Sequence, residues 1–317
     1  MKITFLDAGG LGPDVDLQQF SRWGELKFWN NTAQDERLSH LAGTTVAVAN
    51  RVVFDAEVFS ACPELRLVLL TATGFNNVNL NAARTHGVAV CNIVGYSTES
   101  VAQHTLALLL SLMEQTTWLD DYAKTRWAGN TTFGQLERPF HEIRGSLWGI
   151  IGMGHIGKRV ADLALAFGAR PQYFSSSGID RQTELPRVGL ESLLRSSDIV
   201  TIHSPLNDKT RALLGPREIA WMKPSAYLVN TGRGGIVDEL ALAQALDAGT
   251  LAGAALDVTL PEPPRPENPL LSLNHPERLV LSPHVAWASV ESRNRCLVEV
   301  GLNLQSWLDG GRRNRVD

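Results

Sequence analysis

One segment of this 317-residue chain indicates its fold: Leu147-Trp148-Gly149-Ile150-Ile151-Gly152-Met153-Gly154-His155-Ile156-Gly157. Its apolar start predicts a short buried strand, and the pattern G-x-G-x-x-G follows at once. Apolar residues at helical spacing, from Ile156 to Phe167, then predict a helix. This glycine pattern is weakly specific alone, but it is specific between a strand and a helix. The stretch therefore predicts a turn that binds the pyrophosphate of a dinucleotide.

Each glycine of the pattern has its own physical reason. Gly152 permits the tight turn out of the strand, Gly154 lets the backbone approach a pyrophosphate, and Gly157 lets the helix pack on the strand. The start of the helix adds free N–H groups and the positive end of its dipole. The candidate pyrophosphate-binding residues are Gly152, Gly154, His155, Ile156 and Gly157.

Length and composition indicate a globular protein of two domains. Hydrophobic residues make up 44% of the chain and charged residues 20%, with a net charge of −4 at pH 7. Because there is no long basic or acidic run, the sequence argues against nucleic acid or an anionic membrane as the main partner. Arg312, Arg313 and Arg315 form a short basic tail, which we expect to be a solvated terminus.

The cysteines and the apolar segments indicate the cellular setting. Cys62, Cys91 and Cys296 are too few and too scattered for a disulfide framework or a metal site, and they suit a reducing cytoplasm. The first residues become polar too soon for a signal peptide. The most apolar stretch, 101–113, is too short to span a membrane. We therefore expect a soluble, cytoplasmic protein that holds no metal.

Short apolar runs separated by helix-length segments predict two parallel α/β sheets of the doubly wound type. In the first unit the runs are 3–6, 26–28, 46–49, 67–70 and 88–90. In the second unit they are 147–151, 172–174, 199–203, 227–230, 253–258 and 279–282. A capped helix over 97–110 is apolar on almost every side, so we expect it to be buried, most simply between two domains. A last helix after Ser289 is expected to return to the first domain.

A polar loop at 71–78 leaves the carboxyl end of a strand in the first unit, which is where ligands bind in open α/β sheets. Two interpretations are open. The loop is either a plain turn into a helix, with Asn77 as the cap, or a nest of backbone N–H groups for a substrate carboxylate.

The second strand of the dinucleotide unit ends in an unusual way. An Asp or Glu is expected about 20 residues beyond the glycines, where it holds the adenosine ribose. Here Ser175, Ser176 and Ser177 stand in its place. Serines do not repel a 2′-phosphate and can donate hydrogen bonds to it, and Arg181 is the nearest cation in the sequence. This favours NADP, with NAD held by the serines alone as the alternative.

Three ionisable residues follow strands of the second unit. Arg233 lies among glycines after 227–230, and its planar guanidinium matches an α-keto carboxylate. Glu262 lies between prolines just past 253–258, so its carboxylate needs an outside partner. His284 ends the strand 279–282 and can transfer protons near neutral pH. Singly they indicate little, but three such residues at carboxyl ends of one sheet predict a site.

Other residues have plainer interpretations. We expect His104 to be a satisfied core or interface histidine, and His203 to line the adenine side or to pack. Residues 120–145 are polar and irregular but carry Trp127, Phe133 and Phe140. Such a segment packs either on another subunit or on its own domain.

The chain resembles the D-isomer-specific 2-hydroxyacid dehydrogenase family over nearly its whole length. The segments that carry the resemblance are 72–78, the glycine loop, His203-Ser204-Pro205-Leu206, Met222-Lys223-Pro224, Asn230-Thr231-Gly232-Arg233-Gly234-Gly235, Ala255-Leu256-Asp257-Val258 with Glu262-Pro263, and Pro283-His284-Val285-Ala286-Trp287-Ala288-Ser289. Residues 95–105 and 284–289 look most like the glycerate dehydrogenase, or hydroxypyruvate reductase, branch.

The resemblance implies two Rossmann-like domains with the site in the cleft between them. The substrate domain would be discontinuous, residues 1–98 plus 287–317, and the dinucleotide-binding domain would span 99–286. It also implies that the protein is a homodimer joined through the dinucleotide-binding domain.

The resemblance further implies roles for individual residues. Arg233 would bind the substrate's carboxylate and carbonyl, His284 would be the acid/base, and Glu262 would hydrogen-bond His284 and favour its protonated form. The remaining candidate substrate-binding residues are Thr73, Gly74 and Trp287. Together with the glycine loop, the candidate cofactor-binding residues are Ser175, Ser176, Ser177, His203, Pro205, Thr231, Gly232 and Asp257.

The predicted activity is hydride transfer between NAD(P)H and a small 2-keto acid such as hydroxypyruvate or glyoxylate. Two alternatives remain open: a dinucleotide-sensing scaffold like the corepressors of this fold, and a same-fold dehydrogenase of another small anion such as formate or phosphite. The sequence does not decide the substrate, because Trp287 and Phe75 either narrow the pocket or pack in the core.

Overall fold

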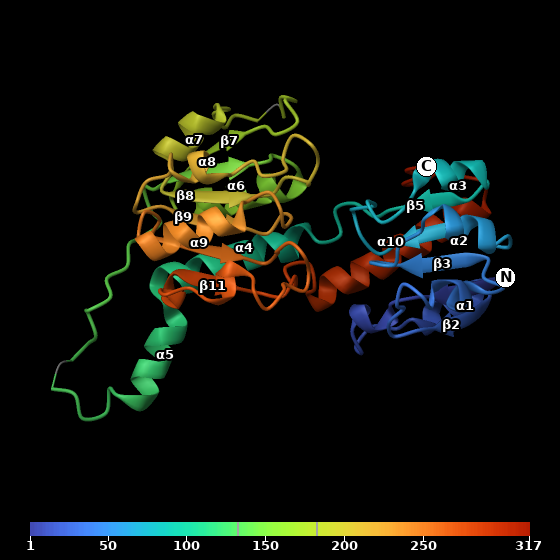
Figure 1. The fold of residues 1–317 in the computed structure, drawn as a ribbon, viewed down its shortest axis with the longest axis horizontal. Helices are drawn as coiled ribbons and strands as arrows, with labels where there is room; N and C mark the ends of the chain where they lie inside the picture. Colours follow the sequence, from blue (N-terminus) through green and yellow to red (C-terminus); the bar gives the residue numbers. More distant parts are fainter. Residues whose placement is uncertain (132, 182) are drawn as a thin grey trace. The chain divides into compact units, whose positions relative to one another are not determined.

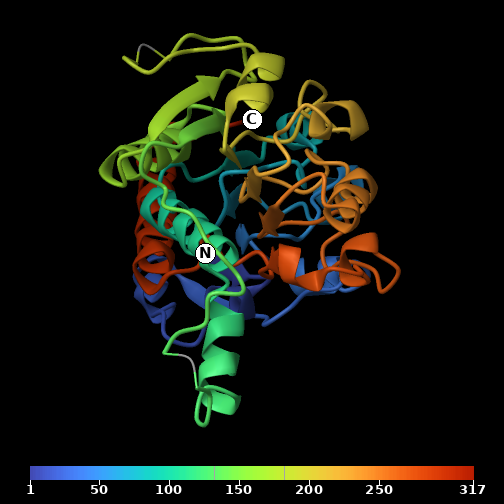
Figure 2. The same cartoon turned by 90° about the vertical axis from the view of Figure 1, so that its left-hand side faces the viewer.

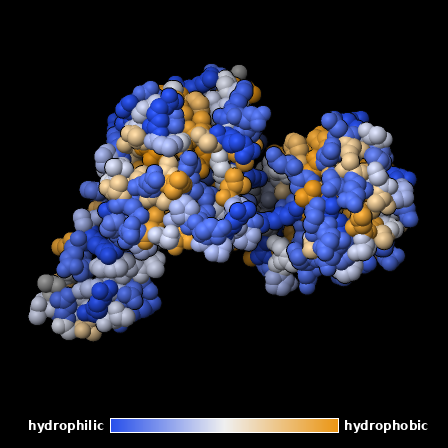
Figure 3. Space-filling view, in the orientation of Figure 1, coloured by the Kyte–Doolittle hydropathy of each residue, from blue (hydrophilic) through white to orange (hydrophobic). Residues whose placement is uncertain are grey.

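The computed structural model describes residues 1–131, 133–181 and 183–317, and it divides the chain into two compact units. The first unit is Met1–Ser97 with Trp287–Asp317, and the second is Thr98–Ala286. Each unit is built on its own parallel sheet (Figure 1). The visible face of each unit is mainly hydrophilic, with hydrophobic residues in small patches (Figure 3).

The sheet of the first unit has the strand order β2-β1-β3-β4-β5, and all its pairs are parallel. Its strands are β1 (Lys2–Phe5), β2 (Glu25–Phe28), β3 (Val46–Ala49), β4 (Leu67–Leu70) and β5 (Ala89–Cys91). Every residue of β3 and β4 is buried, as expected for central parallel strands that are covered on both faces.

Helices cover both faces of this first sheet. The elements are η1 (Ala8–Leu11), η2 (Gln18–Trp23), α1 (Arg37–Leu41), α2 (Ala56–Ala61), α3 (Leu80–Thr85) and α10 (Val290–Leu308). On one face Cys296, Val300 and Leu304 of α10 pack with Phe5 and Leu69. Val58 and Phe59 of α2 pack with residues of the opposite face. The last helix therefore returns to the first unit, as the sequence indicated.

The sheet of the second unit has the order β11-β10-β9-β8-β6-β7, again with parallel pairs. Its strands are β6 (Leu147–Ile151), β7 (Arg170–Phe174), β8 (Ile199–Ile202), β9 (Tyr227–Asn230), β10 (Gly253–Leu256) and β11 (Leu279–Leu281). The strand order reverses between β6 and β8. In doubly wound sheets this switch point is where ligands bind.

Two layers of helices flank this second sheet. One face carries α4 (Thr98–Glu114) and α6 (His155–Ala166), and the other carries α7 (Leu190–Ser196), α8 (Pro216–Ile219) and α9 (Glu239–Ala248). The short turns η3 (Pro269–Leu271) and η4 (Pro276–Arg278) complete the unit. Helix α5 (Thr116–Thr125) projects from the body of the unit (Figures 1 and 2). None of the helices in the described residues is long and apolar enough to cross a membrane.

The predicted fold class of two parallel-sheet α/β domains is confirmed. Each predicted strand lies within two residues of an observed one. Helix α4 is buried as expected, and it packs on α6 and on β9 and β10 of its own unit.

The expectation that the basic tail is solvated is wrong. Residues 314–316 lie antiparallel beside β5: the Asn92 N–H donates to the Asn314 carbonyl at 3.2 Å, and the Val316 N–H donates to the Val90 carbonyl at 2.9 Å. Arg313 donates to Asn303 at 2.6 Å and to Glu299 at 2.7 Å. The physical reason is that β5 ends the sheet, so its open backbone groups are paired by the tail.

The tail is held through Asn303 of α10, which is 1% exposed. Its amide donates to the Asn92 carbonyl at 2.8 Å, and its oxygen accepts from Arg313 and Asn314. We expect Asn303→Ala to lower the free energy of unfolding by about 2–3 kcal/mol, because it leaves buried partners unsatisfied. Urea denaturation measures this. Leu302→Ala, at an exposed neighbouring position on α10, is the control, and an equal effect of both variants would contradict the role given to Asn303.

Candidate active site

The glycine loop has the geometry that dinucleotide binding requires. Gly152 has φ +98°, and a Cβ there would lie 2.5 Å from the Ser204 hydroxyl. A Cβ at Gly157 would overlap the Gly152 carbonyl oxygen. Gly154 differs, because no heavy atom lies within 4 Å of the place its Cβ would take. Two glycines are thus required by packing, whereas the third leaves open space at the start of α6, which fits a pyrophosphate.

The serine loop after β7 is closed by its own hydroxyl groups. Ser175 donates to the Ile179 carbonyl at 2.7 Å, and Ser177 accepts from the Ile179 N–H at 3.3 Å. Ser176 reaches the next loop of the sheet, where its hydroxyl lies 2.8 Å from that of Ser204. Ser176 is therefore the serine that connects this loop to the switch point, while Ser175 closes the turn.

The charged neighbours of this loop are not the ones that sequence order suggests. Arg181 and Arg187 are both exposed, and Arg187 donates to the Gly178 carbonyl at 2.8 Å. An acid is also close, because Asp180 accepts from the Tyr173 hydroxyl at 3.2 Å. The sequence missed Arg187 and Ser204, since only the fold brings them to this loop.

His203 follows β8 at the switch point and stays neutral. Its Nδ1 lies 3.4 Å from the Thr231 hydroxyl, which in turn lies 2.9 Å from the hydroxyl of Thr105. Burial lowers the pKa of His203 to about 3. Its Nε2 is buried and has no hydrogen-bond partner in the described part of the chain. A buried polar atom of this kind is costly unless a ligand group pairs with it, which fits a cofactor beside His203.

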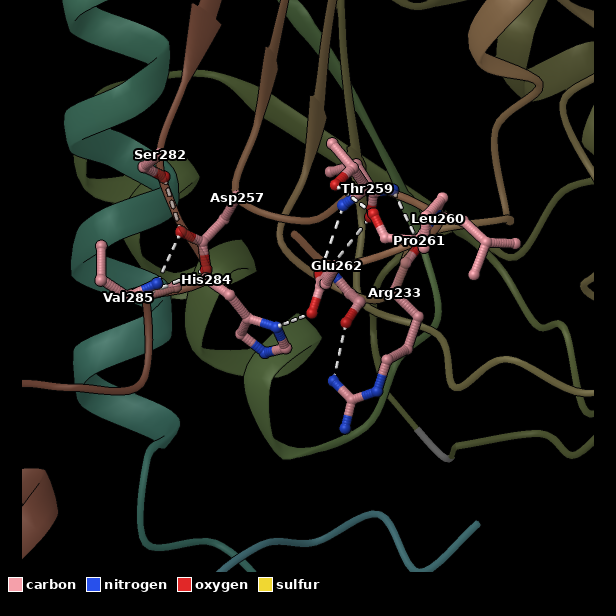
Figure 4. Close-up of polar contacts among 12 residues, drawn as sticks. Arg233, Asp257, Thr259, Leu260, Pro261, Glu262, Ser282, His284 and Val285 are labelled. Carbon is pink, nitrogen blue, oxygen red and sulfur yellow. Dashed lines mark hydrogen bonds and ion pairs between the residues drawn. The ribbon is translucent and has the colours of Figure 1, made fainter. Parts of the chain in front are cut away.

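Arg233, Glu262 and His284 come together at the carboxyl edge of the second sheet (Figure 4). His284 Nδ1 lies 2.6 Å from Glu262 Oε2, and the other Glu262 oxygen accepts from the Thr259 N–H at 3.3 Å. Arg233 is exposed, and its Nη1 donates to the Gly232 carbonyl at 2.8 Å. The arrangement provides an oriented imidazole beside a guanidinium, the groups needed to protonate an oxygen and bind an anion.

The other candidate residues of the second unit lie in the loops around this edge. The Gly232 N–H donates to the Asn230 side chain at 3.0 Å, and the Pro205 carbonyl accepts from Thr210 at 2.6 Å. Asp257 follows β10 and is 2% exposed. Their cofactor-binding roles remain predictions.

The remaining candidates belong to the first unit. The backbone N–H groups of Thr73 and Gly74 donate to no acceptor within the described residues, as an N–H nest requires. Trp287 is half-buried and packs on Tyr96, with ring centroids 6.3 Å apart. Of the two interpretations of the 71–78 loop, the one in which Asn77 caps a helix is wrong. Asn77 donates to the Asn50 and Val52 carbonyls, and Asn79 caps α3 instead.

Comparisons with known proteins show which family the chain is similar to. Residues 106–286 match the model of the D-isomer specific 2-hydroxyacid dehydrogenase, NAD binding domain. The chain is 35% identical to a glycerate dehydrogenase of Methylorubrum extorquens, covering 100% of this chain and 99% of the relative. It is 33% identical to a hydroxypyruvate reductase of Blautia hydrogenotrophica, with both chains fully covered.

Solved structures show the same architecture. An acyclic imino acid reductase in complex with NADPH and D-Arg is 27% identical, with a TM-score of 0.88 and both chains fully covered. A D-lactate dehydrogenase of Aquifex aeolicus in complex with NAD and lactic acid is 25% identical, with a TM-score of 0.84 over 98% of this chain and 96% of that one.

The family match and the parallel sheet of the second unit indicate an oxidoreductase with an NAD-binding Rossmann domain. The chain belongs to the family of D-isomer-specific 2-hydroxyacid dehydrogenases. These relatives favour the enzyme over the scaffold and over a dehydrogenase of another small anion.

The glycine loop yields a matched pair of variants. Gly157→Ala should lower the free energy of unfolding by about 1–3 kcal/mol without cofactor, because its Cβ overlaps backbone. Gly154→Ala should leave that stability unchanged but weaken NAD(P)H binding at least ~10-fold, because the methyl group fills the open space. Urea denaturation and fluorescence titration measure the two effects. Normal binding by Gly154→Ala would place the pyrophosphate elsewhere.

Proposed function

We propose that this enzyme reduces small 2-keto acids, with hydroxypyruvate and glyoxylate as the first candidates, to D-2-hydroxy acids. The observation that carries the proposal is the 2.6 Å contact between His284 and Glu262 beside the exposed Arg233. The names of the relatives, glycerate dehydrogenase and hydroxypyruvate reductase, support this substrate class.

Each residue of the proposed site has its own role in the reaction. The reduced nicotinamide, when bound, supplies the hydride for the carbonyl carbon. Because Glu262 accepts the Nδ1 proton of His284, the proton on Nε2 is the one that His284 gives to the carbonyl oxygen, completing the hydroxyl group. The Arg233 guanidinium binds the carboxylate and stabilises the charge that develops on that oxygen. We also assign the Thr73 and Gly74 N–H groups, together with Trp287, to substrate binding.

His284→Ala should lower kcat for hydroxypyruvate by roughly 10²–10⁴-fold, because the proton donor is lost. The Kd of the cofactor, measured by fluorescence titration, should stay the same. A second histidine–glutamate pair provides the control: His275 Nδ1 lies 3.2 Å from Glu277 on the surface, and His275→Ala should keep full activity. Loss of cofactor binding in His284→Ala would instead assign His284 to the cofactor pocket.

We propose NADPH as the preferred cofactor. No carboxylate stands at Ser175, Ser176 or Ser177, and Arg187 is hydrogen-bonded to the same loop. Hydroxyl and guanidinium groups suit a 2′-phosphate. The same loop could hold the ribose of NADH through the serines, so a direct comparison decides between the two cofactors.

Initial rates with NADPH and with NADH test the cofactor preference. We expect NADPH to be preferred, and Arg187→Ala to raise the KM for NADPH about 10-fold while the KM for NADH stays within twofold. Arg195→Ala is the control, since Arg195 pairs with Glu191 on the exposed face of α7. A wild-type preference for NADH would overturn the proposal.

We also propose a cytoplasmic homodimer. Support comes from the segment after α5, where the side chains of Phe133 and Leu136 are 98% and 87% exposed. Apolar side chains exposed to this extent are typical of a surface that binds another protein subunit. The buried free cysteines fit a reducing compartment. Phe133→Ser with Leu136→Ser should shift the mass in light scattering from dimer to monomer. A wild-type monomer would contradict the proposal.

A further inference from the structure

The segment 282–286 contains His284, whose backbone conformation is uncommon. His284 has φ +55°, in the left-handed region that residues with a Cβ rarely adopt. Such a conformation persists only where the surroundings hold it. The backbone N–H of His284 donates to the carbonyl oxygens of Asp257, at 2.8 Å, and Ser282, at 3.1 Å. The position of the His284 ring beside Glu262 therefore depends on the contacts that hold this segment in place.

The Asp257 carboxylate is the anchor of the segment. It accepts from the Val285 N–H at 2.9 Å, from the Ala286 N–H at 2.9 Å, and from the Ser282 hydroxyl at 2.6 Å. Its side chain is 1% exposed, so these three donors replace the hydrogen bonds that water would make to the carboxylate. The bonds lie on both sides of His284, as Figure 4 shows for Ser282 and Val285.

Helix α4 completes the anchor from the other side. Because Ser282 gives its only hydroxyl proton to Asp257, its oxygen is the acceptor for His104, whose Nε2 lies 3.0 Å away. The same Nε2 lies 3.7 Å from Asp257 Oδ1. The hydroxyl of Ser100, one turn earlier on α4, donates to the Ala286 carbonyl at 2.6 Å. A chain of polar contacts thus runs from His104 through Ser282 to Asp257.

We propose that His104 and Ser282 are positioning residues for the reaction: His104 orients the Ser282 hydroxyl, which orients the Asp257 carboxylate and so fixes the His284 segment. This inference rests on the proposed function of His284. It differs from the expectation that His104 is only a satisfied core histidine, because the partner of His104 lies two residues before His284.

A double-mutant cycle tests the proposal. Ser282→Ala and His104→Leu should each lower kcat for hydroxypyruvate about 10-fold, with KM and the cofactor Kd within twofold, because binding groups are kept and the proton donor is misplaced. The double variant should be no worse than Ser282→Ala alone, since His104 acts through Ser282. Ser282→Thr and His104→Gln keep the hydroxyl and the N–H donor, and they should restore most of kcat. Gln103→Leu, at the exposed neighbouring position on α4, is the control.

Amide hydrogen exchange supplies a readout that needs no turnover. The Val285 and Ala286 amides should exchange faster in Ser282→Ala and in His104→Leu than in the wild type, while the amides of β9 stay protected. Unchanged kcat in His104→Leu, or losses in kcat that add in the double variant, would overturn the proposal. If the wild type reduces no 2-keto acid, the proposed function fails. The positioning role then stands or falls by the exchange of these two amides.

Discussion

Parallel strand pairing brings the residues of the candidate site together. Strands that run in one direction bring all their carboxyl ends to one edge of the sheet. In the second unit the loops after β6, β8, β9, β10 and β11 therefore emerge at the same edge. Residues far apart in sequence, from the glycine loop to His284, become neighbours for this reason alone.

Buried polar contacts then fix the positions of the loops at this edge of the sheet. Asp257 and Thr231 leave adjacent strands, and each joins a chain of hydrogen bonds that ends on α4, at His104 and at Thr105. One helix thus supports both the His284 segment and the surroundings of His203. Buried side chains that are linked by hydrogen bonds tolerate few alternative arrangements, which is what a site of fixed geometry requires.

The sequence predicted the parts of this protein that depend on local pattern. Strand positions follow from short apolar runs, and the glycine loop follows from conformational limits at Gly152 and packing limits at Gly157. Arg233, Glu262 and His284 were found because each lies in a segment that follows a strand. The contact of His284 with Glu262 was expected from the family resemblance, and no local pattern in the chain contains it.

Side-chain partners set by the fold could not be predicted in this way. Arg187 bonds the serine loop although Arg181 is nearer in sequence, and the partner of His104 is 178 residues away. The Arg-rich tail was expected in solvent because its composition is polar, yet the open edge of β5 binds it. Periodicity identifies elements and buried faces, but it carries no information on which polar groups meet across the fold.

The stereochemistry of the reverse reaction shows whether the Arg233–Glu262–His284 edge is the site of a D-2-hydroxyacid dehydrogenase. D-glycerate and L-glycerate would be supplied separately with the oxidised cofactors at alkaline pH, and reduced nicotinamide would be followed by its absorbance. We expect turnover of the D-isomer alone. Comparable oxidation of L-glycerate would contradict the assignment of this site.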